Sequence, residues 1–499
     1  MTSFPTLRGA VCVATLFAAG TAQADVTAEQ VWADWQANMS TYGDETIATG
    51  SEVREGDTLT ISNIVLTMND EFSTVTATMG DLILTELGDG TVAIQPPASY
   101  PIKIVGEEDI NMTMTVNQSG LEMIASGTPD ALNYAITADQ YGIGISDIIE
   151  NGEKLNGNFR LIANDVSGTY TSRPGDVREV DYNLVAASID VLADMAATEL
   201  PGDYFTLSGR VEGFSATATV AMPDGEDVTP DAIFARGFGF NGGYAYKSSA
   251  YLFDVKAEGE QTSGMARTGA GTLSADLSAD RVSYDSNITD MNVAVQGAEV
   301  PFPIEVAMAE YGFGIDMPLA PSDEASDFGL RLNMTDLAVN DAIWMMADPS
   351  GALPHDPATL LIDLSGQARL LLDLMNTEQA MEMGEVGMPA ELTALTLNDL
   401  SLKIGGAELA AKGDFTFDNT DLATFDGFPR PTGKVTANLR GANALIDDLV
   451  EIGVVPADQA MMGRMMMGMF ATPVGDDELT STLEVKGSGS VIANGQKIR

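Results

Sequence analysis

Residues 360–375 constrain the fold more than any other stretch, because their hydrophobicity alternates with a period of two. Even positions from 360 to 374 are apolar or small, whereas odd positions include Asp363, Gln367 and Arg369. Successive side chains of a β-strand point to opposite faces, so the stretch predicts a strand with one apolar and one polar face. About 15 residues would span about 50 Å, which favours a long, curved sheet. A break near Gly366 into two hairpin-linked strands is the alternative.

Several alternating stretches also slip in phase by one residue. Apolar residues have relative spacing 0, 2, 5, 7 and 9 in residues 59–68 and 395–404, and four of the five positions recur in residues 330–339. The slips fall at polar residues such as Asn63 or Asn398-Asp399. One extra residue in a period-two strand is typical of a β-bulge. We therefore predict bulged strands of similar build, with chance similarity as the alternative.

Helices are predicted at both ends of the chain. Residues 25–42 begin with Thr27 and Gln30 at capping-box spacing, and one face then carries Trp32, Trp35 and Met39. Helices are also predicted over 442–452 and 457–470, with a short one over 340–347 that Asn340 would cap. Gly453 is a typical helix end and Pro456 a typical helix start.

Three dipeptides between alternating stretches predict tight hairpin turns, namely Asp89-Gly90, Asn241-Gly242 and Asn494-Gly495. The predicted fold class is therefore α+β and β-dominated, with long antiparallel, bulged and curved sheets, an N-terminal helix and a C-terminal helix pair. Segment 318–326 is the predicted linker between an N-terminal β-rich region (25–320) and a C-terminal one (321–499) that carries the helix pair. One continuous body is the alternative.

Residues 1–24 predict a secretory signal peptide. Arg8 precedes an apolar stretch, and Ala22-Gln23-Ala24 is a small-x-small cleavage site. The apolar stretch is shorter than the roughly 20 residues that span a membrane, which argues against an anchor. We expect cleavage after Ala24, a periplasmic product and no transmembrane helix in the mature chain. Cys12, the only cysteine, would leave with the leader, so no disulfide is expected.

The charge balance excludes some partners. The chain has 73 acidic and 24 basic residues and a net charge of −49. Nucleic acids need Lys and Arg to neutralise phosphates, so no nucleic-acid partner is expected. Docking to anionic lipid through a basic patch is disfavoured for the same reason. Apolar residues make up 45% of the chain, which is ample for a core.

Motifs for catalysis or cofactors are largely missing. His355, the only histidine, lies between two prolines and is predicted to face solvent in a turn, so the chain cannot form a histidine triad or a multi-histidine zinc site. Residues 237–242 match G-x-G-x-x-G, but no helix is predicted after them to bind a phosphate. Acidic clusters at 107–109, 224–227 and 476–478 lack EF-hand spacing and are predicted to be solvated. We therefore predict no catalytic, cofactor-binding or metal-binding residues and no cofactor.

The helix predicted over 457–470 carries a stripe of methionines, Met461, Met462, Met465, Met466 and Met469, with Met467 beside them. Methionine is flexible and apolar, so the favoured interpretation is a face that packs on a sheet or a partner. A surface for a hydrophobic ligand and a Cu(I) site are the alternatives, and the second has no histidine or cysteine nearby.

The run from Trp344 to Leu360, followed by residues 363–366, resembles a signature of an uncharacterised exported bacterial family, domain of unknown function two-one-two-five. The late helices and residues 476–480 fit the C-terminal part of that family. The resemblance implies a match over nearly the whole mature chain, and it supplies no activity or catalytic residues. The strand pattern is also remotely similar to AsmA-like envelope proteins, whose long sheets form grooves linked with lipid handling, although this chain lacks their N-terminal anchor.

These observations lead to two main hypotheses. The first is a non-catalytic exported cell-envelope protein that shelters lipid or another apolar ligand on a long one-faced sheet. The second is a structural protein, or one that binds envelope proteins, whose apolar faces are closed in its own core. An enzyme of unknown class is a distant third. The helix over 457–470 spans only about 20 Å, so part of the apolar face at 360–374 should lie under another sheet layer or form a groove. Leu370 and Leu372 should be buried, and Asp363, Gln367 and Arg369 exposed.

Overall fold

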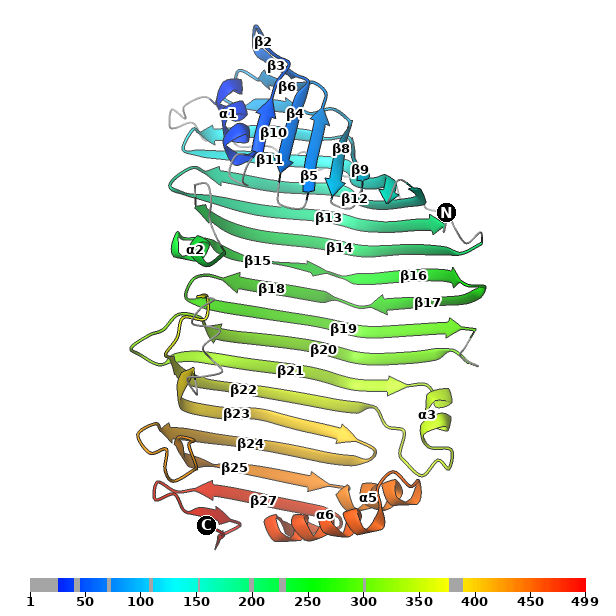
Figure 1. Cartoon of the computed structure of the whole chain (residues 1–499), viewed down its shortest axis with the longest axis vertical. Coiled ribbons are helices and arrows are strands. Elements are labelled where there is room, and N and C mark those ends of the chain that lie inside the picture. The colour runs from blue at the N-terminus through cyan, green and yellow to red at the C-terminus, as the bar shows by residue number, and fades with distance from the viewer. Residues whose placement is uncertain are drawn as a thin grey trace, which may run out of the picture.

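In a computed structural model, the chain forms one antiparallel sheet that runs the length of the molecule (Figure 1). The structure describes residues 26–39, 45–69, 73–106, 111–150, 153–196, 202–223, 230–298, 302–376 and 389–499. The predicted β-dominated fold is confirmed, with a helix at the N-terminal end of the sheet and a helix pair at the C-terminal end. The predicted signal peptide and the acidic clusters at 107–109 and 224–227 lie outside the described residues.

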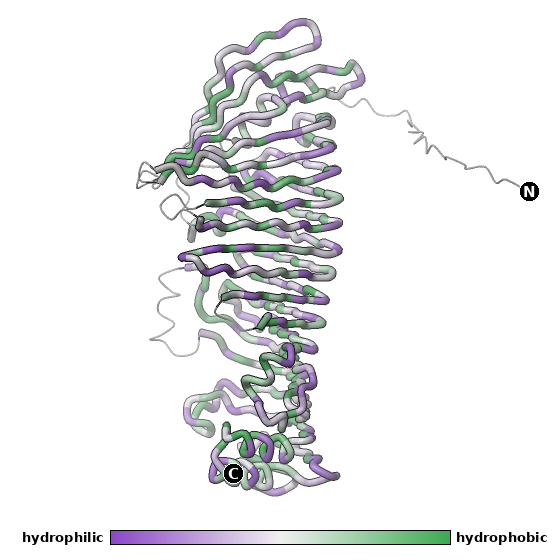
Figure 2. Tube along the Cα trace, turned by 90° about the vertical axis from the view of Figure 1, so that its right-hand side faces the viewer, coloured by the Kyte–Doolittle hydropathy of each residue, from purple (hydrophilic) through white to green (hydrophobic). Residues whose placement is uncertain are grey.

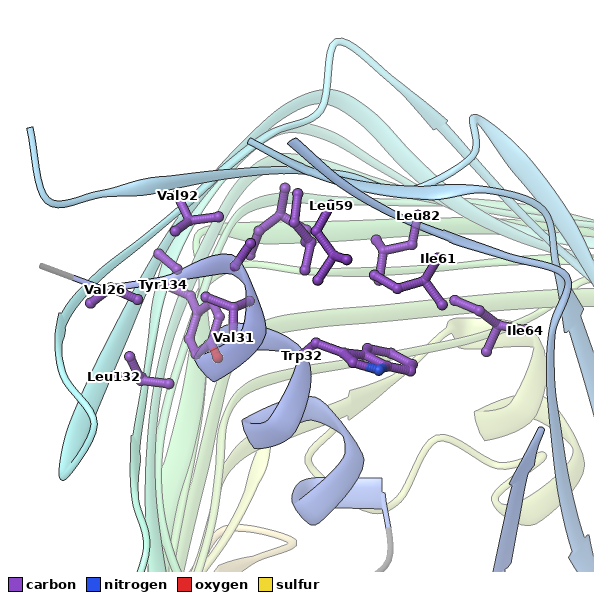
Figure 3. Packing of buried hydrophobic residues seen from close by; sticks show 14 residues of the cluster. Val26, Val31, Trp32, Leu59, Ile61, Ile64, Leu82, Val92, Leu132 and Tyr134 are labelled. Atoms are coloured by element: carbon purple, nitrogen blue, oxygen red, sulfur yellow. The ribbon is translucent and has the colours of Figure 1, made fainter. Parts of the chain in front are cut away.

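The N-terminal end consists of one helix and short strands. The elements are α1 (Ala28–Met39), β1 (Glu45–Ala48), β2 (Ser51–Glu55), β3 (Thr58–Ser62), β4 (Ile64–Asn69), β5 (Ser73–Met79), β6 (Leu82–Glu86), β7 (Val92–Gln95), β8 (Ser99–Gly106), β9 (Asn111–Ser119) and β10 (Glu122–Thr128). The sheet curls around α1 at this end (Figure 3).

The middle of the sheet is built from long strands. The elements are β11 (Ala131–Glu150), β12 (Glu153–Arg173), β13 (Val177–Ala196), β14 (Tyr204–Pro223), α2 (Pro230–Ala235), β15 (Gly239–Tyr246), β16 (Ser248–Ala257), β17 (Glu260–Thr268), β18 (Gly271–Leu277), β19 (Arg281–Gly297), β20 (Ile304–Pro318) and β21 (Ser326–Val339). Both β15 and β16 pair with β14, so they share one row of the sheet.

The C-terminal end adds further strands and the helix pair. The elements are α3 (Asp341–Ala347), β22 (Ala358–Leu370), β23 (Ala390–Ile404), β24 (Ala407–Asp418), β25 (Arg430–Arg440), α5 (Ala442–Glu451), α6 (Ala457–Phe470), β26 (Thr472–Gly475), β27 (Glu478–Val485), β28 (Val491–Ala493) and β29 (Gln496–Lys497). The candidate linker 318–326 connects β20 to β21, and these strands pair with each other, so the sheet continues across it.

One face of the sheet is apolar from β11 to β27. Directly paired residues form a row across the strands from β11 to β27: Tyr134, Tyr170, Tyr182, Ala218, Gly242, Ala275, Tyr284, Ile315, Leu330, Leu364, Leu397, Gly413, Val435 and Leu483. We call the surface that contains this row the apolar face. Figure 2 shows hydrophobic and hydrophilic residues alternating along the strands.

The neighbouring row points the other way and is almost wholly polar. Its members are Asn133, Thr171, Asp181, Thr219, Asn241, Asp276, Ser283, Asp316, Gly329, Ser365, Thr396, Asp414, Lys434 and Glu484. We call this surface the polar face. Since strand neighbours share a face, the alternation predicted from one strand holds for the whole sheet.

Two of the predicted bulges are confirmed, because the β21–β22 register shifts between Met334 and Leu337 and the β23–β24 register shifts between Leu397 and Leu400. At Asn63 the chain instead passes from β3 to β4, which pair with different strands, so the bulge predicted there is wrong. Asp165, Asp290 and Asp336 adopt left-handed backbone (φ 48°, 50° and 53°), which Asp tolerates better than most residues.

The phase slip also keeps apolar residues on one face of the sheet along the whole strand. In β13, for example, Ala186 and Ile189 are three residues apart, yet both belong to one apolar cluster with Val166 and Ala163 of β12. Without the extra residue, the second half of each strand would turn its apolar side chains to the polar face.

The predicted strand at 360–375 is one strand, β22, without a break at Gly366, but it ends at Leu370. Leu370 is buried and Gln367 exposed, as predicted. The expectation for Leu372 is wrong, because it follows the strand end and is half-buried. Asp363 and Arg369 are also half-buried. The reason is contact with the next strand, where Asn398 donates to Asp363 (2.9 Å) and Arg369 pairs with Glu391 (2.7 Å).

Two of the three predicted hairpin turns are confirmed. Asp89-Gly90 connects β6 to β7, and Asn494-Gly495 connects β28 to β29 with φ of 48° and 84°. Asn241-Gly242 lies inside β15, so that prediction is wrong. A Cβ at Gly242 would lie 2.7 Å from the carbonyl oxygen of Thr217, so glycine is needed there for close strand packing. The G-x-G-x-x-G stretch therefore enters a strand.

The predicted helices form with nearly the expected bounds. The capping box of α1 is present, with the Thr27 amide donating to Gln30 Oε1 (3.0 Å) and the Gln30 amide to Thr27 Oγ1 (3.3 Å). Gly453 follows α5 with φ of 77°, which suits glycine after a helix end. Asn340 is the N-cap of α3, but its side chain donates to the Pro303 carbonyl (2.7 Å) rather than capping the helix.

Candidate apolar ligand site

Two adjoining cavities lie between α1 and the apolar face. One has a volume of about 640 Å³ and extends over β11–β15 and β18, and the other, of about 440 Å³, extends toward β4, β5 and β8. Both are lined by Trp35, Met123, Ile136 and Leu184. Neither lining contains a charged residue, although 19% of the chain is charged. Together they form a hollow suited to hydrocarbon.

The first turns of α1 are packed into a dry core. Val31 and Trp32 are buried against strands β3, β6 and β7, and Figure 3 shows the strands arching over them. The indole N–H of Trp32 donates to Glu52 Oε1 (3.1 Å), so its polar atom is satisfied. Trp35, one turn further, is only partly buried and lines both cavities. The helix therefore forms a wall of the hollow.

A buried ion pair holds α1 on the sheet. Asp34 of α1 accepts hydrogen bonds from Arg178 Nη1 (3.1 Å), Ser172 Oγ (3.0 Å) and Tyr134 OH (2.7 Å). The side chains of Asp34 and Arg178 are each 7% exposed. Buried charges need such partners, because desolvation otherwise outweighs their attraction. The network fixes the position of Trp35 relative to the sheet.

Aromatic rings continue from this network along the apolar face. The ring centroids of Tyr134 and Tyr170 are 5.2 Å apart, and those of Tyr170 and Tyr182 are also 5.2 Å apart. Burial raises the pKa of Tyr134 and of Tyr170 above the ordinary range, and the Asp34 carboxylate raises both further. These hydroxyl groups therefore stay neutral, and they place no charge in the hollow.

Glycines allow other rings on this face to lie flat. A Cβ at Gly209 would lie 2.2 Å from the ring of Tyr251, and one at Gly366 would lie 2.5 Å from the ring of Phe328. Phe253 covers Gly264 in the same way. Each ring therefore occupies the space over a glycine on the next strand, which keeps the surface low and smooth.

Beyond α1, the described part of the apolar face is partly exposed. Tyr182, Leu184 and Tyr244 are 41%, 40% and 41% exposed, and Leu330 further along is 36% exposed. Single exposed apolar residues are ordinary, but a continuous row of them usually marks a binding surface. A closed core, as in the second hypothesis, would bury this row.

His355 and the acidic cluster at 476–478 do not line the hollow. His355 is exposed as predicted, and its ring stacks on Trp344 with centroids 4.4 Å apart. In the cluster at 476–478, Asp477 caps α5 by accepting from the amides of Asn443 (3.1 Å) and Ala444 (3.0 Å), while Glu478 pairs with Arg440. Within the described ranges, no group of three or more His, Cys, Asp or Glu side chains is placed to hold a metal ion.

The methionine stripe does not pack on the sheet. Met461, Met462, Met465, Met466 and Met469 are between 53% and 69% exposed, so the prediction that they pack on the sheet is wrong, and a face for a partner or a hydrophobic ligand stays a prediction. Ala460 is the buried residue of α6, and Arg464 reaches back to Asp447 of α5 (2.6 Å). The helix therefore contacts α5 through its small and polar side chains and directs its thioethers outward.

The lining of the hollow could not be identified from the sequence. The sequence marked Trp35 on one face of the first helix, but Tyr134, Tyr170 and Tyr182 meet only through strand pairing over long sequence separations. Asp34 and Arg178 are likewise 144 residues apart. No motif marks them.

Comparison with known proteins identifies a family for the C-terminal half. Residues 252–491 match the family model described as "Uncharacterized protein conserved in bacteria (DUF2125)". The match confirms for residues 252–491 the family that the sequence resembles. It does not include the residues before 252, although the sequence predicted a match over nearly the whole mature chain. No curated protein and no solved structure matches the chain, so the remote similarity to AsmA-like proteins gains no support.

Among the helices that the structure describes, none combines the length and the hydrophobicity that crossing a membrane requires.

Proposed function

We propose that the protein is a non-catalytic carrier that shelters the hydrocarbon part of a lipid, or a similar apolar ligand, on its apolar face. The observation that carries this proposal is the uncharged hollow between Trp35 and the Tyr134–Tyr170–Tyr182 row, which opens onto an uncovered apolar surface. Burial of hydrocarbon there would contribute about 25 cal/mol for each Å² removed from water.

The dimensions support hydrocarbon chains as the ligand class. Adjacent strands are about 4.8 Å apart, so the apolar row from β11 to β27 extends for about 60 Å. The hydrocarbon core of a bilayer is about 30 Å thick, so one acyl chain is about half that length. The face is therefore long enough for more than one chain, and the hollow at α1 would hold part of the first.

The proposed role belongs outside the cytoplasmic membrane, and this placement rests on the leader-like sequence of residues 1–24. N-terminal sequencing of protein from its native host should find Asp25 first. Material that still begins at Met1 would remove the basis for a periplasmic carrier.

Neighbouring residues of β13 provide a matched test of ligand binding. Leu184 lines the hollow and is 40% exposed, whereas Val185 is 43% exposed on the polar face. Protein purified from its native host without detergent should yield lipid on organic extraction and mass spectrometry. Leu184→Glu should lose most of it, because a carboxylate in the hollow would have to be desolvated. Val185→Glu adds the same charge and should keep the parent's lipid content.

The test has two outcomes that contradict the proposal. One is a parent protein that carries no lipid or other apolar compound. The other is equal lipid content in the Leu184→Glu and Val185→Glu proteins, which would place any bound lipid elsewhere on the molecule.

A further inference from the structure

The outward surface of α6 is unlike the rest of the molecule. Five methionines point away from α5 along a helix of 14 residues, and the charge of Arg464 on its inner side is paired with Asp447. Asp458 and Arg464 are the only charged residues of α6, in a chain whose net charge is −49. We call the side chains of Met461, Met462, Met465, Met466 and Met469 the methionine surface.

Two glycines of α6 have no packing role among the residues that the structure describes. A Cβ at Gly463 or Gly468 would meet no atom within 4 Å, so neither glycine is needed for packing. Each costs roughly 1 kcal/mol of helix stability relative to Ala. Exposed apolar residues also flank the helix on both sides, at Val454 and Val474. The surface therefore presents hydrocarbon and sulfur to whatever lies outside.

From its lack of charge and its flexible side chains, we propose that the methionine surface docks the protein onto the zwitterionic surface of a lipid bilayer. The helix would lie parallel to the bilayer, with its thioethers at the boundary between headgroups and acyl chains. Unbranched methionine side chains adapt to a fluid surface. Docking relies on apolar insertion alone, because α6 offers no group of basic residues to anionic headgroups.

Size and charge argue against other occupants. At 1.5 Å per residue, α6 is about 21 Å long and about 10 Å wide, a footprint of roughly 200 Å². A stable protein interface buries about 800 Å² on each partner. A second copy would also bring another net charge of −49 close to the first. A bilayer needs neither a large footprint nor shape complementarity.

The position of α6 would place the apolar face near a docked bilayer, but docking itself does not require a ligand on the apolar face. The Phe470 carbonyl at the end of α6 accepts hydrogen bonds from Ser481 of β27 (2.6 Å) and from Asn494 in the turn between β28 and β29 (2.8 Å). Figure 1 shows α5 and α6 at the end of the sheet opposite to α1. Docking would therefore hold the C-terminal end of the apolar face near the bilayer.

Vesicle flotation tests this inference. Protein exported and purified from its host, with its N-terminus sequenced so that no leader remains, is mixed with phosphatidylcholine vesicles and with vesicles that contain phosphatidylglycerol. It should float with phosphatidylcholine vesicles to a similar extent at low and high salt, and less well with the anionic vesicles at low salt. Met465→Glu should weaken partitioning about tenfold or more, because it replaces an inserted side chain by a charge.

Leu252→Glu is the matched control, because Leu252 is 56% exposed on the polar face of β16, far from α6 in the sheet order. It adds the same charge and should float like the parent. Circular dichroism checks that both variants are folded.

Three results would overturn the inference. They are no flotation of the parent, equal flotation of Met465→Glu and the parent, and a dimer in light scattering that Met465→Glu dissociates. Loss of flotation with unchanged lipid content would support docking by α6, and it would leave the carrier role intact.

Discussion

The helices at the two ends of the sheet, α1 and α6, differ in the burial of their apolar side chains. Val31 and Trp32 of α1 are at most 5% exposed, whereas Met461 and Met465 of α6 are 69% and 64% exposed. The strands curl over α1, and a buried ion pair fixes it to the sheet. α6 packs on α5 and leaves five of its six methionines exposed. Apolar composition alone therefore does not determine whether a helix face is buried. The face is buried only where another part of the protein packs against it.

The sharpest way to test this contrast is to truncate one large side chain on each helix. Trp32→Ala should lower the free energy of unfolding by about 4 kcal/mol, because it leaves a cavity in the core under α1. Met465→Ala should change it by less than about 0.5 kcal/mol. Urea unfolding followed by circular dichroism measures both. Comparable losses for the two variants would mean that α6 is as buried as α1.

The ion pair under α1 predicts the next largest effect. Asp34→Asn would leave Arg178 buried without its counter-charge and should cost about 3 kcal/mol. Asp447→Asn removes the partner of Arg464 on α6, where the aspartate is 70% exposed, and should cost less than about 1 kcal/mol. A loss below about 1 kcal/mol for Asp34→Asn would show that the pair does not hold α1 in place.

The capping box of α1 predicts a smaller effect. Thr27→Ala removes the side chain that accepts from the Gln30 amide and should cost about 1 kcal/mol. Thermal unfolding measures it. Thr27→Ser keeps the acceptor and should behave like the parent. An equal loss in the Ser variant would assign the effect to the threonine methyl group instead.

The smallest effect is on pH dependence at the N-terminal end. Hydrogen bonds from Arg54, and then from the Ala28 amide, lower the pKa of Glu86 below its ordinary value. The folded state therefore binds this proton less readily than the unfolded state. The stability from Glu86 is present above about pH 4.5 and is lost as the pH falls through the lowered folded pKa. Glu86→Gln should reduce the loss of stability between pH 6 and pH 3, and an unchanged loss would contradict this role.

The parts of the fold that follow from local sequence could be predicted. Alternation predicted β22, and phase slips predicted the bulges near Asp336 and Asn398. Thr27 and Gln30 predicted the start of α1. The pattern also predicted an apolar face, because strand geometry alone assigns alternate residues to one side.

What covers that face could not be predicted from the sequence. The methionines of α6 have the pattern of a packed helix, and only the three-dimensional structure shows that nothing described in this chain lies against them. Asn241-Gly242 has the composition of a turn, but the close approach of Thr217 from another strand explains its glycine. The tyrosine row at the hollow depends on pairing between strands and leaves no local signal.

Tryptophan fluorescence tests the central claim most directly, because two of the three tryptophans line the hollow. In a Trp344→Phe protein, only Trp32 and Trp35 remain. Fatty acid or phosphatidylcholine with brominated acyl chains should quench this emission, and Trp35→Phe in the same background should remove most of the quenching. Binding of the brominated lipid without quenching, or quenching that depends on Trp344 alone, would contradict a hydrocarbon-binding hollow beside α1.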